Sequence, residues 1–277
     1  MNDDETLQEE VKKKVSGLRY AIPSIVIMLL FLTVFICVVY ILVQNYPASG
    51  DSVIRLVTGK MLKKDPNSLD SKDFLTITTL DLSEQTLPDI RLLRKFRNLK
   101  ELNLSRLKIP RTEMPKWKAI LVKMHIIKVT TVGSRNSLTE ASLLNLRPLK
   151  KLTNLETLNL NYTPIESIAP LSSLKKLTEL DIFGAGVFDL KPVGKLSNLG
   201  ILNVGKTKIT DLKPVQKLTK LHRIHIYNTD IADLKPLMNL SNLDYVDMRK
   251  CKNITDSEVE NLQQSLPKLV IFVDANQ

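Results

Sequence analysis

Residues 196–217 read LSNLGILNVGKTKITDLKPVQK, and residues 218–239 repeat the pattern as LTKLHRIHIYNTDIADLKPLMN. Apolar side chains return every 22 residues, and several such columns share one phase. Repetition at a fixed period of this length is the sequence signature of a solenoid. The columns include Leu155, Leu177, Leu199, Leu221 and Leu243; Leu158, Leu180, Leu202, Ile224 and Val246; Leu160, Ile182, Val204, Ile226 and Met248; and Pro170, Pro192, Pro214 and Pro236.

The segment Leu158-Asn159-Leu160 predicts a short strand in each unit. Successive side chains of a strand point to opposite faces, so the two leucines turn inward and the residue between them turns outward. Each buried leucine stabilises the fold by about 1.5–3 kcal/mol. Because no unit can bury its apolar face alone, the stability of the domain comes from stacking neighbouring units.

Each unit reads L-x-x-L-x-x-L-x-L-x-x-T-x-I-x-x-L-x-P-L/V, which resembles the leucine-rich repeat family. The spacing is similar to the 22-residue class of bacterial internalins and of a nuclear regulator of a protein phosphatase. The last unit, residues 246–269, resembles the cysteine-containing subclass. The resemblance implies an α/β solenoid, a horseshoe with a parallel sheet on its concave face. It also implies a binding function rather than catalysis.

The repeats cover residues 74–277 in about eight or nine units. Two early units carry Ile77, Leu80 and Leu82, then Leu99, Leu102 and Leu104. Between residues 105 and 151 the spacing stretches, and we expect residues 126–130 to supply the strand of an irregular unit. The family has Asn where the chain leaves each strand, and here those positions hold Thr163, Ala185, Thr207, Thr229 and Cys251. This predicts a weakened hydrogen-bond ladder, with irregularity near Ala185.

Both ends of the solenoid need caps. Residues 51–64 predict an amphipathic helix with Asp51 as its N-cap residue. Its inward side chains would be Val53, Ile54, Val57, Met61 and Leu62. At the other end, residues 255–258 indicate a helix start, and residues 269–273 a closing strand.

Residues 22–43 carry no charge over 22 positions. At about 1.5 Å per residue this length matches a hydrocarbon core of about 30 Å. The stretch is longer than the core of a cleaved signal peptide, which favours an uncleaved signal anchor. The predicted organisation is a cytoplasmic tail (1–21), a transmembrane helix (22–43), a linker with a cap helix (44–73) and the repeat domain (74–277). Basic residues before the span place the N-terminus in the cytoplasm and the repeats on the other side.

The concave face offers candidate partner-binding residues. Phe183 and Tyr227 lie two units apart in the column after the strand, with Gly205 between them. Exposed aromatic side chains with nearby charges are typical of protein-binding hot spots. The alternative is that these rings fold against neighbouring strands without a specific role. The candidate residues are Tyr162, Asp181, Phe183, His225, Tyr227, Tyr245, Asp247 and Arg249.

The formal charge is +11, and it is uneven, because residues 1–21 carry −1 and residues 44–277 carry +12. Lysines recur on the loop after the strand and on the convex side, which predicts a positive stripe for anionic polymers or membrane surfaces. A solvated surface is the simpler alternative. The stripe consists of Lys191, Lys213 and Lys235, followed by Lys195 and Lys217.

No motif predicts an enzyme, a metal site or a cofactor. His222 and His225 lack a third metal ligand, and Cys37 and Cys251 have no metal-binding spacing. We therefore expect a membrane-anchored scaffold or receptor for a protein partner, with no catalytic residues. The alternatives are an accessory subunit of a membrane complex and a protein that binds anionic surfaces. Aromatic residues do not interleave with the lysines, which disfavours nucleic acid.

Overall fold

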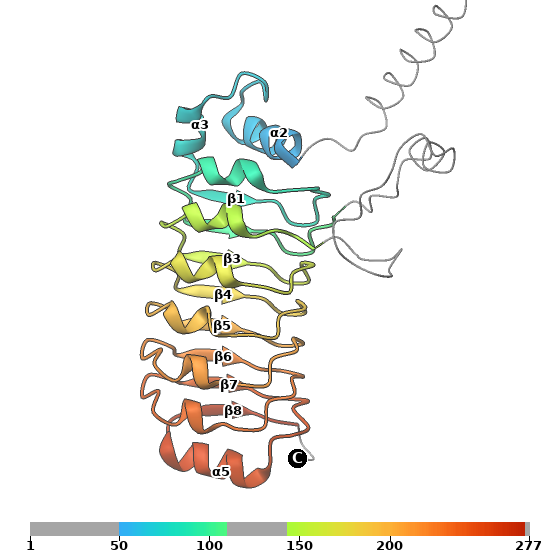
Figure 1. Ribbon diagram of the computed structural model, residues 1–277. Helices are drawn as coiled ribbons and strands as arrows, with labels where there is room; N and C mark the ends of the chain where they lie inside the picture. Colours follow the sequence, from blue (N-terminus) through green and yellow to red (C-terminus); the bar gives the residue numbers. More distant parts are fainter. Residues whose placement is uncertain (1–49, 110–142, 275–277) are drawn as a thin grey trace, which may run out of the picture. The chain divides into compact units, whose positions relative to one another are not determined.

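The computed structural model describes residues 50–109 and 143–274, and within them one parallel sheet runs in chain order from β1 to β8 (Figure 1). Equivalent positions of neighbouring units pair, as Leu158 does with Leu180 and Leu180 with Leu202. The repeat period therefore sets the register, as predicted. The strands are β1 (Thr79–Asp81), β2 (Glu101–Asn103), β3 (Thr157–Asn159), β4 (Glu179–Asp181), β5 (Ile201–Asn203), β6 (Arg223–His225), β7 (Tyr245–Asp247) and β8 (Val270–Phe272).

Short 3₁₀ helices return the chain between strands, on the opposite side of each turn (Figure 1). Asp211 accepts the backbone N–H of Lys213 at 2.8 Å, and Pro214 then occupies the first turn, where it needs no donor. The Asp-Leu-Lys-Pro sequence is thus a helix start. The helices are η1 (Arg91–Lys95), η2 (Arg147–Lys151), η3 (Ala169–Ser173), η4 (Val193–Lys195), η5 (Lys213–Val215) and η6 (Lys235–Leu237).

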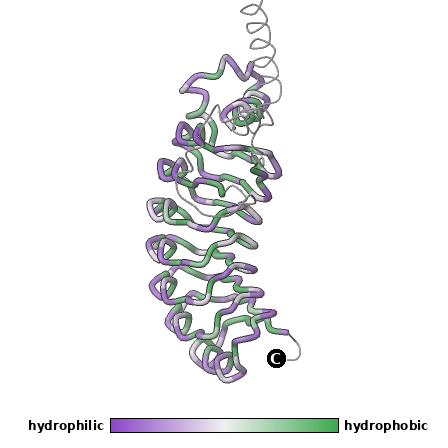
Figure 2. The backbone as a smooth tube through the Cα atoms, turned by 45° about the vertical axis from the view of Figure 1, so that its right-hand side comes forward, coloured by the Kyte–Doolittle hydropathy of each residue, from purple (hydrophilic) through white to green (hydrophobic). Residues whose placement is uncertain are grey.

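The repeated leucines form one continuous core. Leu158, Leu180 and Leu202 are fully buried, while Asn159 and Asn203 are half-buried on the other face of the sheet. Hydrophobic and hydrophilic stretches alternate around every turn of the chain (Figure 2). The inward and outward assignment made from the strand period is confirmed.

The buried column after the strand bonds to backbone carbonyls. Thr163 donates to Leu104 at 2.9 Å, Thr229 donates to Ile226 at 2.7 Å, and the thiol of Cys251 donates to Ile226 at 3.0 Å. Ala185 has no such group, but its backbone N–H donates to Ile182 at 3.1 Å. The β4–β5 register continues unbroken beside it, so the sheet shows no irregularity there.

A second ladder lies in the turn that precedes each strand. The side-chain amides of Asn154, Asn198 and Asn242 donate to backbone carbonyls of the preceding unit at 2.6–2.9 Å. In the units between them, Lys176 donates to Asn154 and Lys220 donates to Asn198. Asparagine therefore still joins adjacent units, at a different position from that of the family pattern.

The strands β2 and β3 are neighbours in the sheet although the sequence between them is long. Leu102 pairs directly with Leu158, so β3 occupies the edge of β2. The strand predicted at residues 126–130 falls within residues 110–142. Residues 110–142 themselves lie outside the described residues.

Helices α2 (Gly50–Leu62) and α3 (Ser71–Thr76) form the N-terminal cap. Ile54 is fully buried, and Val53, Val57 and Leu62 pack partly against the core. Met61 is 46% exposed, so its predicted inward position is wrong. Asp51 lies within the helix, which includes Gly50, and is therefore not its N-cap residue.

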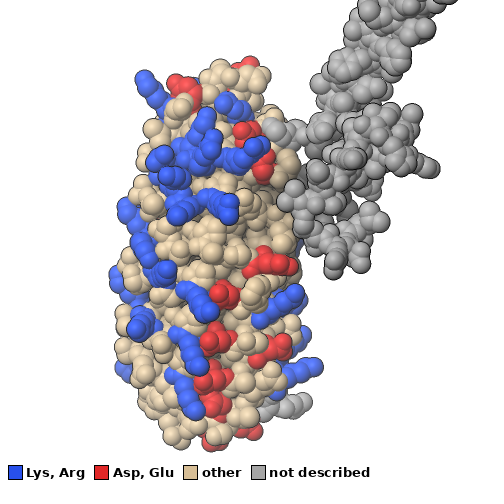
Figure 3. Space-filling view, in the orientation of Figure 1, with Lys and Arg blue, Asp and Glu red and all other residues tan. Residues whose placement is uncertain are grey.

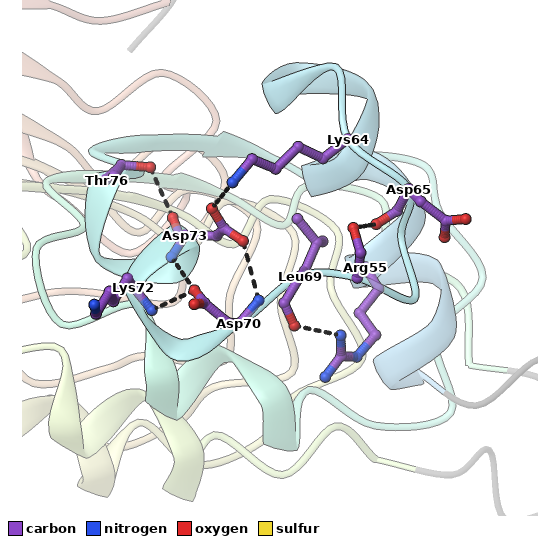
Figure 4. A network of polar contacts seen from close by, with 9 residues as sticks. Arg55, Lys64, Asp65, Leu69, Asp70, Lys72, Asp73 and Thr76 are labelled. Carbon is purple, nitrogen blue, oxygen red and sulfur yellow. Dashed lines mark hydrogen bonds and ion pairs between the residues drawn. The ribbon is translucent and has the colours of Figure 1, made fainter.

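Polar contacts tie α2 to α3 (Figure 4). Lys64 pairs with Asp73, and Arg55 donates to the carbonyl of Leu69 at 3.1 Å. Asp70 caps α3 through a capping box with Asp73. The hydrogen bond from Lys64 lowers the pKa of Asp73. These contacts hold the two cap helices together.

The C-terminal cap follows the sequence prediction. Thr255 is the N-cap residue of α5 (Asp256–Ser265) and accepts from the N–H of Glu258. The last strand, β8, then pairs with β7. Among the described residues no helix is long and apolar enough to cross a membrane, and the predicted span at residues 22–43 lies outside them.

Candidate partner-binding surface

The outward side chains of the strands and of the turns that follow them form one surface, which we call the sheet face. It consists of the first and third residue of each strand and the residues two and three positions after the strand. In β4 these positions hold Glu179, Asp181, Phe183 and Gly184. These side chains face outward because successive residues of a strand point to opposite faces, so that outward residues alternate with buried ones.

The Asp and Asn residues that end strands on this face accept hydrogen bonds from the turns that follow. Asp181 accepts the N–H of Phe183 at 3.1 Å through one oxygen and the amide of Asn161 at 2.7 Å through the other. Asn203 accepts the N–H of Gly205 in the same way. Such contacts are the Asx turns expected of these residues. The carboxylate of Asp181 thus positions Phe183.

Three aromatic rings form a row along the turn, which we call the aromatic row. The ring centroids of Tyr162 and Phe183 lie 5.3 Å apart at 80°, and those of Phe183 and Tyr227 lie 6.2 Å apart. Edge-to-face and offset contacts at such distances are favourable. The structure therefore brings together three of the residues predicted from sequence.

Glycines make room for this row. A Cβ on Gly205 would lie 2.8 Å from the ring of Phe183, and one on Gly184 would lie 2.6 Å from the ring of Tyr162. Phe183 can therefore lie across the intervening unit and reach Tyr227. Gly184 also has φ of +69°, a conformation that glycine adopts without strain.

A second group of rings lies toward the C-terminal end. His225 and Tyr245 have centroids 5.1 Å apart, as do Tyr245 and Phe272. Phe272 was not among the residues predicted from sequence, which assigned it only to a closing strand. The signal was present, because Phe272 pairs with Asp247 and so extends the outward column by one unit.

Arg249 joins the two groups. Its guanidinium lies 5.8 Å from the centroid of Tyr227 and 5.9 Å from that of Phe272. The same guanidinium donates to both oxygens of Asp247, at 2.9 and 2.8 Å. This two-point contact fixes the plane of the guanidinium between the rings.

The two titratable groups beneath Arg249 have shifted pKa values. Burial opposes ionisation of Asp247, but the hydrogen bonds and charge of Arg249 bring its pKa below the ordinary value. Burial lowers the pKa of His225, although Asp247 lies 3.9 Å away and opposes the shift. At neutral pH the site thus holds an ionised Asp247 and a neutral His225.

Four more cations lie over these rings, and sequence reasoning missed all of them. Arg106 lies 5.9 Å from the centroid of Tyr162, and Lys206 lies 5.5 Å from that of Phe183. Lys250 and Arg223 lie 5.4 and 5.2 Å from Tyr227 and Tyr245. Three of these cations, Arg106, Lys206 and Lys250, share one repeat position with positive φ, and that shared position is the signal that could have identified them.

The predicted lysine stripe lies elsewhere, along the 3₁₀ helices. Lys213 and Lys235 begin η5 and η6, while Lys191 precedes η4, Lys195 ends it and Lys217 follows η5. A shallow depression of about 410 Å³ lies between η5 and η6. Its lining includes Lys213, Lys217, Lys235, Asp233, Gln216 and Asn239.

Acidic side chains accompany this stripe. Asp189, Asp211 and Asp233 each accept the backbone N–H of the lysine two residues on. On the face shown in Figure 3, a column of Asp and Glu runs down the lower part of the repeat domain, with Lys and Arg on both sides of it. The surface is therefore mixed in charge rather than uniformly basic.

Comparisons with known proteins agree with this architecture. Residues 153–187 match the family model described as leucine-rich repeats in two copies. No curated protein matches the chain. Internalin C2 of Listeria monocytogenes is 22% identical, with a TM-score of 0.56, over 81% of this chain and 96% of that one.

A leucine-rich repeat protein of Leptospira interrogans is 20% identical, with a TM-score of 0.51. That match covers 73% of this chain and 50% of the Leptospira protein. Identities this low establish the similarity of fold alone. The family match at residues 153–187, the 22-residue period and the parallel sheet show a leucine-rich repeat solenoid in this chain.

Proposed function

We propose that this chain is a membrane-anchored scaffold or receptor whose repeat domain captures a protein partner on the sheet face between Tyr162 and Phe272. The observation that carries the proposal is the continuous array of rings and cations there. Tyr162, Phe183 and Tyr227 pack in a row, and Arg249 links them to Phe272. Tyrosine and arginine are enriched among the residues that dominate binding energy.

The side chains of this surface are held in place before a partner binds. Each ring already contacts another ring or a cation, so little side-chain freedom is lost on association. Tyr162 and Phe272 nevertheless keep 46% and 42% of their surface exposed. A partner can thus bury apolar area against side chains that are already in place.

The charges on this surface favour a partner with acidic side chains beside apolar ones. The carboxylates of Asp181 and Asp247 are occupied by contacts within the chain. Lys206, Arg223 and Lys250 lie over rings at the surface. Cations at the rim of an apolar patch speed association with an acidic partner and help to select it.

The test is partner capture by the full-length chain from host-cell extracts. We expect Phe183→Ala, Tyr227→Ala and Arg249→Ala each to reduce the captured amount at least tenfold. Phe188→Ala is the matched control, because Phe188 is an aromatic residue that is 63% exposed outside the sheet face. Equal capture by all four variants, with unchanged melting, would exclude this surface.

Membrane anchoring through residues 22–43 is supported by their length and lack of charge. Protease protection on intact cells, with tags at both ends, tests the proposed orientation. Loss of the C-terminal tag alone supports repeats outside the cytoplasm, and protection of that tag contradicts it. If the chain is instead an accessory subunit of a membrane complex, other membrane proteins will copurify equally with wild type and Tyr227→Ala.

Binding to an anionic surface through the lysine stripe is the second candidate. The ammonium groups of the stripe form no ion pair within the described part of the chain, and this favours binding to an anionic surface. The stripe comprises Lys191, Lys195, Lys213, Lys217 and Lys235. This second candidate predicts salt-sensitive binding to anionic vesicles. Replacing Lys213, Lys217 and Lys235 by Ala should abolish that binding, while replacement by Arg should preserve it.

A further inference from the structure

The last strand, β8, leaves one edge of the sheet open. Among the described residues it pairs only with β7, through Val270 N–H to Asp244 at 3.0 Å and Met248 N–H to Phe272 at 2.9 Å. Successive residues of a strand direct their backbone groups to alternate sides. The N–H and C=O groups of Ile271 and Val273 therefore point to the open edge.

The adjacent residue is already satisfied within the chain. Leu269 donates its N–H to Leu266 at 3.0 Å, and its carbonyl accepts from the side chain of Gln263 at 3.2 Å. The carbonyl of Leu269 keeps a second lone pair. The open part of the edge thus runs from Ile271 to Val273, next to one carbonyl that can accept again.

This edge lacks the usual protection against pairing. Leu269–Val273 reads LVIFV, with no charge and no proline. Val270, Phe272 and Val273 are 51%, 42% and 37% exposed. Natural edge strands normally carry charges, proline or a covering segment that prevents association. An apolar edge of strong β-forming residues indicates that another strand covers it.

The sequence around this edge is complementary to itself. Residues 268–274 read KLVIFVD, so a basic and an acidic residue stand three positions on either side of Ile271. In an antiparallel pair centred on Ile271, Lys268 of each chain faces Asp274 of the other. Val270 of each chain then faces Phe272 of the other on the sheet face.

We propose that β8 pairs antiparallel with β8 of a second copy of this chain, with the two-fold axis at Ile271. Ile271 N–H donates to the Ile271 carbonyl of the second copy, and the reverse bond follows by symmetry. Val273 N–H donates to the carbonyl of Leu269 across the axis. One oxygen of Asp274 accepts from Lys250 N–H at 2.6 Å, and its other oxygen faces Lys268 of the second copy.

The interface is small. A five-residue strand pair buries less than the roughly 1,200–2,000 Å² of a standard interface. We therefore expect a weak, concentration-dependent dimer that benefits from tethering of both copies in one membrane. The pairing does not rest on the proposed capture of a protein partner, because it uses the backbone edge rather than the aromatic row.

Disulfide cross-linking tests the register. The full-length chain is prepared with Cys37→Ser, and Val270→Cys and Phe272→Cys are introduced into separate preparations. Facing residues satisfy the Cα separation of about 4.4–6.8 Å that a disulfide needs. Identical residues of the two copies lie about 8 Å apart by the same strand spacing. The two preparations are then mixed and oxidised. The mixture should give at least fivefold more disulfide-linked dimer than either preparation oxidised alone. Equal yields in all three, or none in any, would overturn the proposal.

A backbone variant tests the open edge directly. Val273→Pro removes an N–H that points away from β7, so the β7–β8 pairing should remain. We expect it to lower cross-linking at least fivefold relative to Val273→Ala, with an unchanged melting transition. Equal cross-linking by the two variants would contradict the pairing.

Charge reversal provides a variant that keeps the backbone intact. Lys268→Glu alone and Asp274→Lys alone each place like charges opposite one another in the dimer. We expect each to dimerise less than wild type, and a mixture of the two to recover. A mixture that dimerises no better than its components would contradict the register.

Discussion

The ammonium group of Lys220 donates a hydrogen bond to the side-chain oxygen of Asn198 in the preceding unit, at 2.6 Å. The amide nitrogen of Asn198 in turn donates to the carbonyl of Lys175 at 2.7 Å. Three consecutive units are thus joined through one asparagine. The same arrangement joins Lys176 to Asn154.

Asn198→Ala should lower the free energy of unfolding by about 0.5–1.5 kcal/mol, because it removes a side-chain contact to a backbone carbonyl. Urea denaturation followed by circular dichroism measures the change. Ser197→Ala, in the adjacent exposed position, is the control and should change stability by less than about 0.5 kcal/mol. Equal effects of the two substitutions would show that the ladder contributes nothing.

Gly205→Ala should displace Phe183, because the added Cβ would lie 2.8 Å from its ring. We expect the contact between Phe183 and Tyr227 to be lost and partner capture to fall several-fold. Ring-current shifts of the Phe183 protons in NMR spectra report the displacement. Gly200→Ala is the control, because its Cβ would lie 2.7 Å from the movable ring of His222 and 3.6 Å, an ordinary contact, from the carbonyl of Thr178. Unchanged Phe183 shifts in Gly205→Ala would contradict this account.

The period of the sequence predicted the sheet and its core. Leu158, Leu180 and Leu202 pair in register because each strand repeats the same two-sided pattern. The pairing of β2 with β3 could not be predicted. The 22-residue phase is lost between Leu102 and Leu158, and only the observed pairing shows that these two are neighbours.

The candidate site was predicted in part. Phe183 and Tyr227 stand out by position, and Gly205 between them explains their contact. Lys206 and Lys250 were missed because a turn residue with a long side chain can reach a ring in a neighbouring unit. Periodicity fixes where a backbone lies, whereas the reach of a flexible side chain depends on the packing around it.

Leu202→Asp should destabilise the repeat domain by about 4 kcal/mol or more, since it places an unpaired charge in a fully buried position. Thermal unfolding of the full-length chain measures the loss. Asn203→Asp is the control, because Asp181 and Asp247 already occupy the equivalent position and accept the same backbone N–H. A melting temperature of Leu202→Asp equal to that of the control would refute the register.

Acidification should destabilise the sheet face through His225. Burial lowers the pKa of this residue in the folded state below its ordinary value of 6.5. The unfolded chain therefore binds the proton more tightly. The contribution of His225 to the free energy of unfolding is therefore fully present above pH 6.5, and it is lost as the pH falls through the lower pKa of the folded state. Other groups add their own pH dependence, so the contribution of His225 is measured as the difference in stability between the wild type and a variant without this histidine.

His225→Gln should remove this part of the pH dependence while keeping a polar side chain of similar size. Arg223, Asp181, Asp247 and Arg249 all act on the titration of His225, and they remain in both proteins. Urea denaturation at several pH values between 5 and 7.5 gives the free energy of unfolding of each protein. The stability of the wild type relative to the variant should decrease on acidification below pH 6.5. A difference that is constant over the whole range would mean that His225 titrates alike in the folded and unfolded chains.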